Sequence, residues 1–286
     1  MVEPVATDVA EPSRVDGLAD LELTLLLEAI LRYSGHDFTN YGQATLKRRI
    51  AERLRAENVA TISGLQERLL HDREALARFV FAMSSGHGRL FADPVFFRVF
   101  RARIVPLLRT YSFVRIWVPN CACGEDAYSL AVLLRDEGLL ERTMIYATDA
   151  SEMAIATARA ATFAFGPEEH PSVAFAACGG ELPLSHFCSM EERSLRFGDD
   201  FQRNLIFAKH SLVTDGSLNE FHVIVARGVL RQFNRALQFR VHNLFLSSLI
   251  RLGFLCLGSS ETLRMTPHEG VFRRLADDAP IYRRMR

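Results

Sequence analysis

The chain has 286 residues, 49% of them hydrophobic, which is enough for one large core or for one core and a smaller helical domain. Lysine plus arginine and aspartate plus glutamate both number 34, so the net charge gives no support for a nucleic-acid-binding protein. No apolar run approaches the roughly 20 residues that span a bilayer.

The N-terminus is acidic and contains proline, so it lacks the basic-then-apolar order of a secretory signal. Its composition predicts that residues 1–15 are disordered. The five cysteines are an odd number in a chain too long to need disulfides, which is typical of a reducing compartment. We therefore expect a cytoplasmic protein with no membrane insertion.

Apolar residues three and four apart predict helices over residues 16–35, 38–59 and 61–84. Residues 16–92 are accordingly predicted to form an all-helical N-terminal domain. The second helix contains the stretch "LKRRIAERLR", which gives it a basic face made of Lys47, Arg48, Arg49, Arg53 and Arg55. This face is either solvated or a docking surface for an acidic partner.

From residue 114 short apolar runs alternate with helical stretches, which predicts an α/β domain over residues 93–286 with a parallel, doubly wound sheet. Helices are expected over residues 125–140, 151–163 and 234–252. Residues 166–204 break the alternation and are interpreted as an inserted subdomain. The expected strands are "VRIWV", "MIYATDA", "LIFAKHSL", "FHVIVAR" and "LGFLCLGSS".

The ends of the first two strands carry the candidate ligand site, because doubly wound sheets bind ligands beyond the carboxyl ends of their strands. Gly124 permits a close turn after the first strand, and Glu125 and Asp126 open the following helix. The dinucleotide pattern G-x-G-x-x-G is absent, and two carboxylates would repel a phosphate. Together with Asp149 after the second strand, they suit ribose hydroxyls and an ammonium group, as in S-adenosylmethionine; ordinary helix capping is the alternative.

Other candidate sites are weaker. Cys121 and Cys123 form a C-x-C, but no second pair of ligands lies at zinc-site spacing, so no metal site is expected. The two thiols fit either loop packing or a redox-sensitive pair. The stretch "GSSE" is not the G-x-S-x-G turn of a hydrolase. His210 follows the third strand and is interpreted as a packed or capping histidine rather than a ligand.

The order of these features resembles the CheR-type chemotaxis receptor methyltransferases over nearly the whole chain. The similar stretches are "LKRRIAERL", "LFADPVFF", "VPLLRTYSFVRIWVPNCACGEDAYSLAVLL", "IYATDAS", "HSLVTDGSLNEFHVIVARGVLRQFN" and "LGSSETLRMTPHE". The resemblance implies an α/β fold with a class I, Rossmann-like, S-adenosylmethionine-dependent methyltransferase sheet, an N-terminal all-helical domain and an inserted small subdomain. The implied activity is O-methylation of glutamate side chains in chemoreceptors.

The resemblance also implies roles for individual positions. Glu125 is expected to meet the ammonium group of the donor and Asp149 its ribose, Leu212 to lie beside the adenine, and Arg227 to belong to the fourth-strand motif. Tyr128 and Glu261 are also shared with the family. Both fit packing or capping as well as ligand contact.

Several ligand-contact positions depart from the family pattern. Gly86, Gly88 and Ala92 stand where the family has Asn, Thr and Arg; Ser211 and Gly228 each replace an Asn, and Gln232 replaces a Tyr. In the donor loop, Asn120 and Cys123 replace a glycine and a threonine. Ala92, Arg231 and Gln232 are expected nearest the reaction centre. Arg231 either compensates for Ala92 or plugs the pocket.

These departures leave two functions open. One is an S-adenosylmethionine-dependent methyltransferase whose partner is the cytoplasmic region of a chemoreceptor. The other is a catalytically degenerate protein of the same fold that binds a receptor or another signalling protein as a regulatory module. Losing several hydrogen bonds of about 0.5 to 1.5 kcal/mol each would weaken donor binding. The predicted donor contacts are Glu125, Asp149, Ser211, Leu212, Arg227, Gly228, Gly86 and Gly88.

Overall fold

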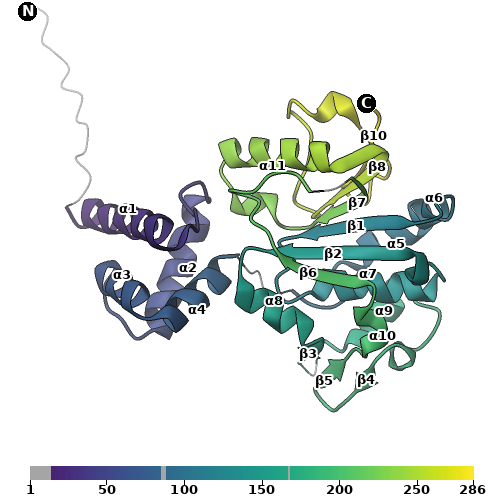
Figure 1. Ribbon diagram of the computed structural model, residues 1–286, viewed down its shortest axis with the longest axis horizontal. Helices are drawn as coiled ribbons and strands as arrows, with labels where there is room; N and C mark the ends of the chain where they lie inside the picture. Colours follow the sequence, from purple (N-terminus) through teal and green to yellow (C-terminus); the bar gives the residue numbers. More distant parts are fainter. Residues whose placement is uncertain (1–13, 85–87, 167, 219) are drawn as a thin grey trace, which may run out of the picture.

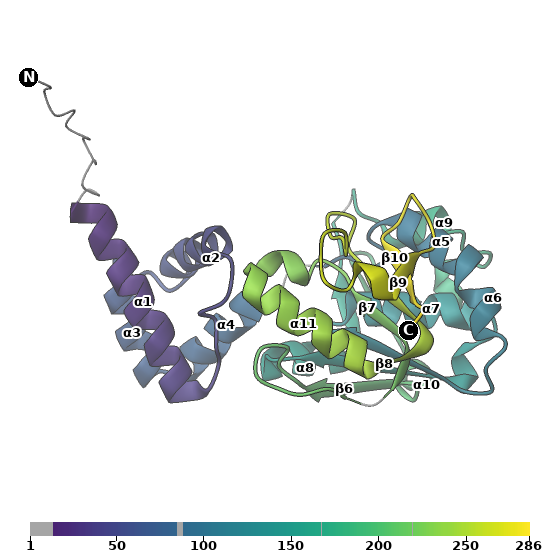
Figure 2. The ribbon, with the colours of Figure 1, turned by 90° about the horizontal axis from the view of Figure 1, so that it is seen from above.

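The computed structural model describes residues 14–84, 88–166, 168–218 and 220–286. A group of helices stands beside a sheet that is covered on both faces (Figures 1 and 2). None of the helices in these residues has the length and apolar character needed to cross a membrane.

Four helices form the N-terminal group: α1 (Arg14–Ser34), α2 (Gln43–Ala56), α3 (Ile62–His71) and α4 (Arg73–Ser84). Helix α1 already contains residues 14 and 15, which were predicted to be disordered; residues 1–13 lie outside the described residues. The single helix predicted over residues 61–84 is two helices. Asp72 separates them, because its extended backbone ends α3 and its carboxylate accepts the Glu74 and Ala75 N–H groups that open α4.

The main sheet has the order β6-β2-β1-β7-β8-β10-β9. Its first five strands pair in parallel, as predicted, whereas β10 is antiparallel to both β8 and β9. The parallel pairing of the five predicted strands is confirmed, whereas the antiparallel C-terminal edge was not predicted. The bounds are β1 (Val114–Pro119), β2 (Thr143–Asp149), β6 (Leu205–Lys209), β7 (Phe221–Ala226), β8 (Leu249–Leu257), β9 (Phe272–Arg274) and β10 (Ile281–Arg284).

Two apolar clusters cover the faces of this sheet. Ile116 and Val118 of β1 pack on one side with residues of the three helices α5 (Pro94–Arg103), α6 (Val105–Leu108) and α7 (Glu125–Asp136). Trp117 points to the other side, where the cluster continues through the C-terminal helix into the N-terminal group. The other two helices involved are α8 (Glu152–Arg159) and α11 (Arg235–Ser248).

The predicted helices over residues 38–59 and 125–140 are shorter, at Gln43–Ala56 and Glu125–Asp136, and two others end where a strand takes over. Helix α11 ends at Ser248, because Leu249 already belongs to β8 and pairs with Phe221 of β7. Helix α8 ends at Arg159, and Thr162–Ala164 is strand β3, whose Phe163 packs edge-on against Tyr128. In both places burial against a neighbouring element overrides the helical spacing of the sequence.

A small sheet lies between α8 and β6 in the chain, with the order β3-β5-β4. It comprises β3, β4 (Ser189–Met190) and β5 (Ser194–Arg196), with α9 (Pro171–Ala177) and α10 (Asp199–Gln202) beside it. Phe197, which follows β5, stacks on Tyr128 of α7 at a centroid distance of 4.8 Å. The domain boundary after residue 92 and the insertion at 166–204 stay predictions.

The N-terminal helices are joined to the sheet through the segment that follows β7. Tyr41 forms an isolated antiparallel bridge with Phe233, and their rings meet edge-on at 5.1 Å. Gly42 N–H donates to the Gln232 carbonyl at 2.8 Å, and Asn234 N–H donates to Asn40 at 2.9 Å. These contacts bring the basic helix α2 to the carboxyl end of the sheet.

Candidate active site

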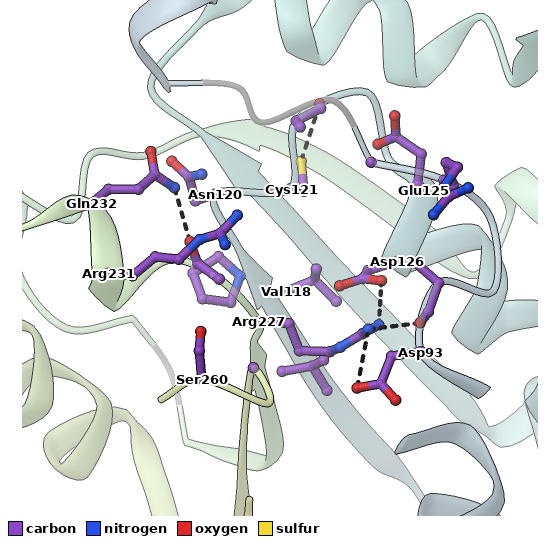
Figure 3. A pocket seen from close by; sticks show the side chains of 18 of the residues that line it. Asp93, Val118, Asn120, Cys121, Glu125, Asp126, Arg227, Arg231, Gln232 and Ser260 are labelled. Atoms are coloured by element: carbon purple, nitrogen blue, oxygen red, sulfur yellow. Dashed lines mark hydrogen bonds and ion pairs between the residues drawn. The ribbon is translucent and has the colours of Figure 1, made fainter. Parts of the chain in front are cut away.

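A cavity of about 500 Å³ opens at the carboxyl ends of β1 and β7 (Figure 3). It is lined by residues of α2, of the linker before α5 (residues 88–93), and of the loops that follow β1, β7 and β8. The charged side chains that line it are Arg48, Arg49, Arg89, Asp93, Glu125, Asp126, Arg227 and Arg231.

The loop after β1 turns sharply to open this cavity. Asn120, Ala122 and Gly124 all have positive φ angles, of 52°, 50° and 94°. A Cβ at Gly124 would lie 3.1 Å from the Ala158 Cβ, so only glycine fits this close approach without a shift. The turn ends at Gly124, the N-cap of α7, which offers no side chain to cap the helix, so the positive end of the helix dipole lies at Glu125.

Glu125 is the first residue of α7 and lines the cavity. Burial raises the pKa of its carboxyl to about 7, and the negative charges of Asp126 and Asp149 add to this, while backbone N–H groups oppose it. Gly88 lies directly against it, since a Cβ at residue 88 would be 3.1 Å from the Glu125 Cδ. A cation bound beside this carboxylate would relieve its unfavourable ionisation.

Asp149 ends β2 but does not line the cavity, and its side chain is fully buried. Its Oδ2 accepts the Ala122 N–H at 3.0 Å and its Oδ1 accepts the Ser151 N–H at 2.9 Å. Ala122 lines the first cavity, whereas Ser151 lines a second cavity of about 450 Å³ between α4 and α8. Asp149 thus lies between two cavities and holds a loop of each.

The structure does not bring Ser211 or Leu212 to the first cavity. The Ser211 hydroxyl accepts the Val213 and Thr214 N–H groups and so stabilises its own turn. Leu212 is 5% exposed and packs in the apolar cluster shared with α11. Of the other predicted positions, Gly86 lies outside the described residues, and Gly88, Ala92, Arg227, Gly228, Arg231 and Gln232 all line the cavity.

Arg227 is turned into the wall of the cavity. Its guanidinium donates to Asp126 Oδ1 at 2.7 Å and to the Ala92 carbonyl at 2.6 Å, and it lies over the Phe96 ring at 4.5 Å. Burial raises the pKa of the Asp126 carboxyl, and Arg227 opposes this rise. The pair fixes the start of α7 to the linker that precedes α5.

Glu261 and Tyr128, the two further residues shared with the family, both form hydrogen bonds to the backbone of this protein. The Glu261 carboxylate accepts the N–H groups of Gly258, Gly228 and Arg231, at 2.7, 3.0 and 3.1 Å, so it holds the loops after β7 and β8 together. The Tyr128 hydroxyl donates to the Ala158 carbonyl, and its ring is fully buried.

Arg49 was assigned to the basic face of α2, but it is only 6% exposed and reaches the cavity. It donates to the Met83 carbonyl and, at 3.0 Å, to Gln232 Oε1. The signal in the sequence is its helical spacing, because Arg49 is three residues after Leu46 and next to Ile50, both buried. Gln232 also donates to the Gly228 carbonyl at 3.1 Å, so its amide is held on both sides.

Metal binding has no candidate in the described part of the chain, where no group of three or more His, Cys, Asp or Glu side chains is placed to hold an ion. Cys121 is buried beside the Ala122 carbonyl, and burial raises the pKa of both its thiol and that of Cys123. His210 is buried edge-on against Trp117, with its Nε2 3.0 Å from the Gly216 carbonyl.

Comparison with known proteins accounts for this arrangement. Residues 21–84 match the family model described as CheR methyltransferase, all-alpha domain, and residues 87–278 match CheR methyltransferase, SAM binding domain. A putative methyltransferase Cher3 of Pseudomonas putida is 37% identical over 93% of this chain and 97% of its own length. A chemotaxis protein methyltransferase of Listeria innocua is 25% identical over 86% and 92%. The chain belongs to the CheR methyltransferase family, and S-adenosylmethionine is the cofactor of its sheet domain.

Proposed function

We propose that the protein transfers a methyl group from S-adenosylmethionine to glutamate side chains in the cytoplasmic region of a chemoreceptor. The observation that carries this proposal is the separation of charge in the cavity. Glu125 lies on one side of the cavity and Arg231 on the opposite side. Asp126 is neutralised by Arg227, whereas Arg49, which bonds Gln232 next to Arg231, adds a second positive charge to the Arg231 side. Such a cavity suits a cationic donor and an anionic acceptor side by side.

The residues at the acidic end fit the donor. Glu125 is a carboxylate whose ionisation is disfavoured by burial, and an ammonium group beside it would favour the charged form. We assign the ammonium contact to Glu125. Each oxygen of Asp149 accepts one backbone N–H group and keeps a further lone pair, so we assign Asp149 both the support of the Ala122 loop and the contact with the ribose.

The chemistry asks little of the protein beyond orientation and charge. Bound S-adenosylmethionine supplies an electrophilic methyl group on a sulfonium. A glutamate acceptor is already ionised at neutral pH, so no general base is needed. The chain must hold the acceptor carboxylate in line with the methyl group and exclude water, which are effects of positioning and electrostatics.

The alternative of a degenerate, non-catalytic relative rested on the altered positions Gly86, Gly88, Ala92, Asn120, Cys123, Ser211, Gly228 and Gln232. The comparisons do not favour it, because the family match includes the SAM-binding domain and a putative methyltransferase is similar over nearly the whole chain. Part of the altered set also lies away from the cavity, as Ser211 does.

The test combines donor binding with methyl transfer. Calorimetric titration with S-adenosylmethionine is expected to show micromolar binding, and a tritiated methyl group is expected to appear as a base-labile ester on purified cytoplasmic fragments of chemoreceptors. The matched control is each fragment with its candidate glutamates changed to alanine. Binding with no ester on any fragment would overturn the assignment of the acceptor. No binding at millimolar donor would overturn the enzyme itself.

A further inference from the structure

The basic end of the cavity contains one arginine whose guanidinium has no acceptor among the described residues. Five arginines line the cavity. Arg48 pairs with Glu52 at 3.0 Å, and Arg89 pairs with Glu169 at 2.6 Å. Arg227 pairs with Asp126, and Arg49 is held by Gln232 and the Met83 carbonyl. Arg231 remains: only its backbone N–H is engaged, by Glu261.

The position of Arg231 is fixed although its side chain is free. It lies in a short 3-10 helix (Leu230–Gln232) directly after β7, and Glu261 holds its backbone. Figure 3 shows its side chain extending into the cavity from the side opposite Glu125. A fixed backbone with an unpaired guanidinium in a cavity is suited to a bidentate carboxylate ligand.

Gly228 leaves the space that this side chain uses. A Cβ at residue 228 would lie 3.6 Å from the Arg231 Nε and 3.8 Å from one of its terminal nitrogens, and the φ angle of 71° further disfavours a side chain. These separations are ordinary van der Waals contact, so a Cβ alone would fit, whereas the further atoms of a longer side chain would compete with the guanidinium for this space. The absence of a side chain at Gly228 and the position of the Arg231 guanidinium therefore depend on each other.

Nearby charge strengthens this end of the cavity as an anion site. The acceptors of the buried Arg49 are an amide and a carbonyl, both neutral, so its charge has no carboxylate partner. Burial lowers the pKa of its guanidinium, and the positive charges of Arg48 and Arg231 lower it further. An incoming anion would offset this repulsion.

We propose that Arg231 binds the acceptor carboxylate and that Gly228 gives its guanidinium the room to do so. The inference rests on the proposed methyl transfer. In that reaction one carboxylate oxygen forms a bond to the methyl carbon while the sulfur–methyl bond breaks and its electron pair stays on sulfur. No proton moves, and the negative charge of the acceptor cancels the positive charge of the sulfonium.

The test uses the receptor fragment that accepts most methyl from the unaltered protein. Arg231→Ala is expected to raise KM for this fragment roughly 10- to 100-fold, the usual loss for a charge-assisted hydrogen-bonded pair. The affinity for S-adenosylmethionine and the melting temperature are expected to stay unchanged. Arg231→Lys should recover part of the lost affinity for the fragment, because lysine keeps the positive charge but cannot bind a carboxylate through two parallel N–H groups. Arg109→Ala, an arginine outside the cavity that pairs with Glu137 at 2.7 Å, is the matched control.

Gly228→Asn tests the second half of the proposal. It should act like Arg231→Ala and add little in the Gly228→Asn/Arg231→Ala double variant, because both remove the same interaction. A KM in Arg231→Ala within twofold of the unaltered protein would overturn the role of Arg231 while leaving the methyltransferase intact. An equal loss from Gly228→Asn with and without Arg231 would overturn the role of Gly228. Donor binding without transfer to any fragment would overturn the proposed acceptor, and this role with it.

Discussion

Arg227 and Asp126 form an ion pair of 2.7 Å in the wall of the cavity, with side chains only 10% and 25% exposed. The pair joins the end of β7 to the start of α7, and the same guanidinium bonds the Ala92 carbonyl. It therefore connects three segments that line the cavity. Its role is to hold the donor loop in place.

Removing Arg227 should destabilise the whole protein. In Arg227→Met the Asp126 carboxylate would lose its counter-charge in a largely buried position, and we expect a loss of about 2 to 4 kcal/mol in the free energy of unfolding. Urea denaturation measures this. The Asp126→Asn/Arg227→Met double variant should regain part of the stability, because no charge is then left unpaired. Strictly additive losses in the double variant would contradict a direct coupling.

The donor affinity should depend on pH through Glu125. Its pKa of about 7 in the free protein means that binding an ammonium group must first ionise the carboxyl at lower pH. From pH 7.5 to pH 6.0 the dissociation constant for S-adenosylmethionine should rise about fivefold to tenfold. Glu125→Gln should bind more weakly and lose this dependence, whereas the donor's own amine titrates equally in both proteins. Parallel pH profiles from calorimetry would exclude Glu125 as the group responsible.

Gly88→Thr restores the residue type of the family pattern, yet it should weaken donor binding. A Cβ at this position would lie 3.1 to 3.3 Å from three atoms of Glu125, so the carboxylate must move. We expect a roughly threefold to tenfold higher dissociation constant for S-adenosylmethionine. Gly270→Thr is the matched control, because a Cβ there meets nothing within 4 Å. Tighter binding in Gly88→Thr would show that the threonine is the missing contact.

A buried histidine pair should make the protein sensitive to acid. His242 of α11 is 5% exposed, and burial, together with the nearby His268, lowers its pKa to about 4. The unfolded chain takes up a proton below its ordinary pKa of about 6.5, whereas the folded protein resists until about pH 4. Stability is therefore lost as the pH falls from about 6.5 to about 4, by an amount on the order of 2 to 3 kcal/mol.

His242→Leu removes this titration from a buried position beside His268. The slope of the unfolding free energy between pH 4.5 and 6.5, measured by urea denaturation, is expected to be smaller in this variant, with His268 supplying what remains. An unchanged slope would mean that other groups control the acid response.

Much of this architecture is predictable from the sequence, because the spacing of apolar residues indicates which side of each helix or strand is buried. The run "VRIWV" and the first turn of α7 are where the sequence predicts them, and the parallel core of the sheet follows from alternating strands and helices. The antiparallel edge was missed because β9 and β10 are short and rich in arginine, with Arg273 opposite Arg283. Neither strand shows the apolar run typical of a buried strand.

The candidate site was predictable only in part. Glu125 was found because helix starts and strand ends have recognisable positions in the sequence. Asp149 has the same kind of position, but the Ala122 N–H group that its carboxylate accepts is brought to it by the tertiary fold. Arg49 was placed on the wrong face because its charge was given more weight than its helical spacing. Partners 183 residues apart, such as Arg49 and Gln232, leave no local pattern.

The bond between Arg49 and Gln232 also constrains how this protein can diverge. Arg49 belongs to α2 and Gln232 to the segment that follows β7, and the Tyr41–Phe233 bridge lies close to both. A substitution at one position leaves a polar group unpaired at the other, so the two should change together in evolution. A chimera that exchanged the helical domains of two relatives would combine residues that do not match where α2 contacts the segment after β7. The residues that join the helical group to the sheet are thus expected to be inherited as one unit.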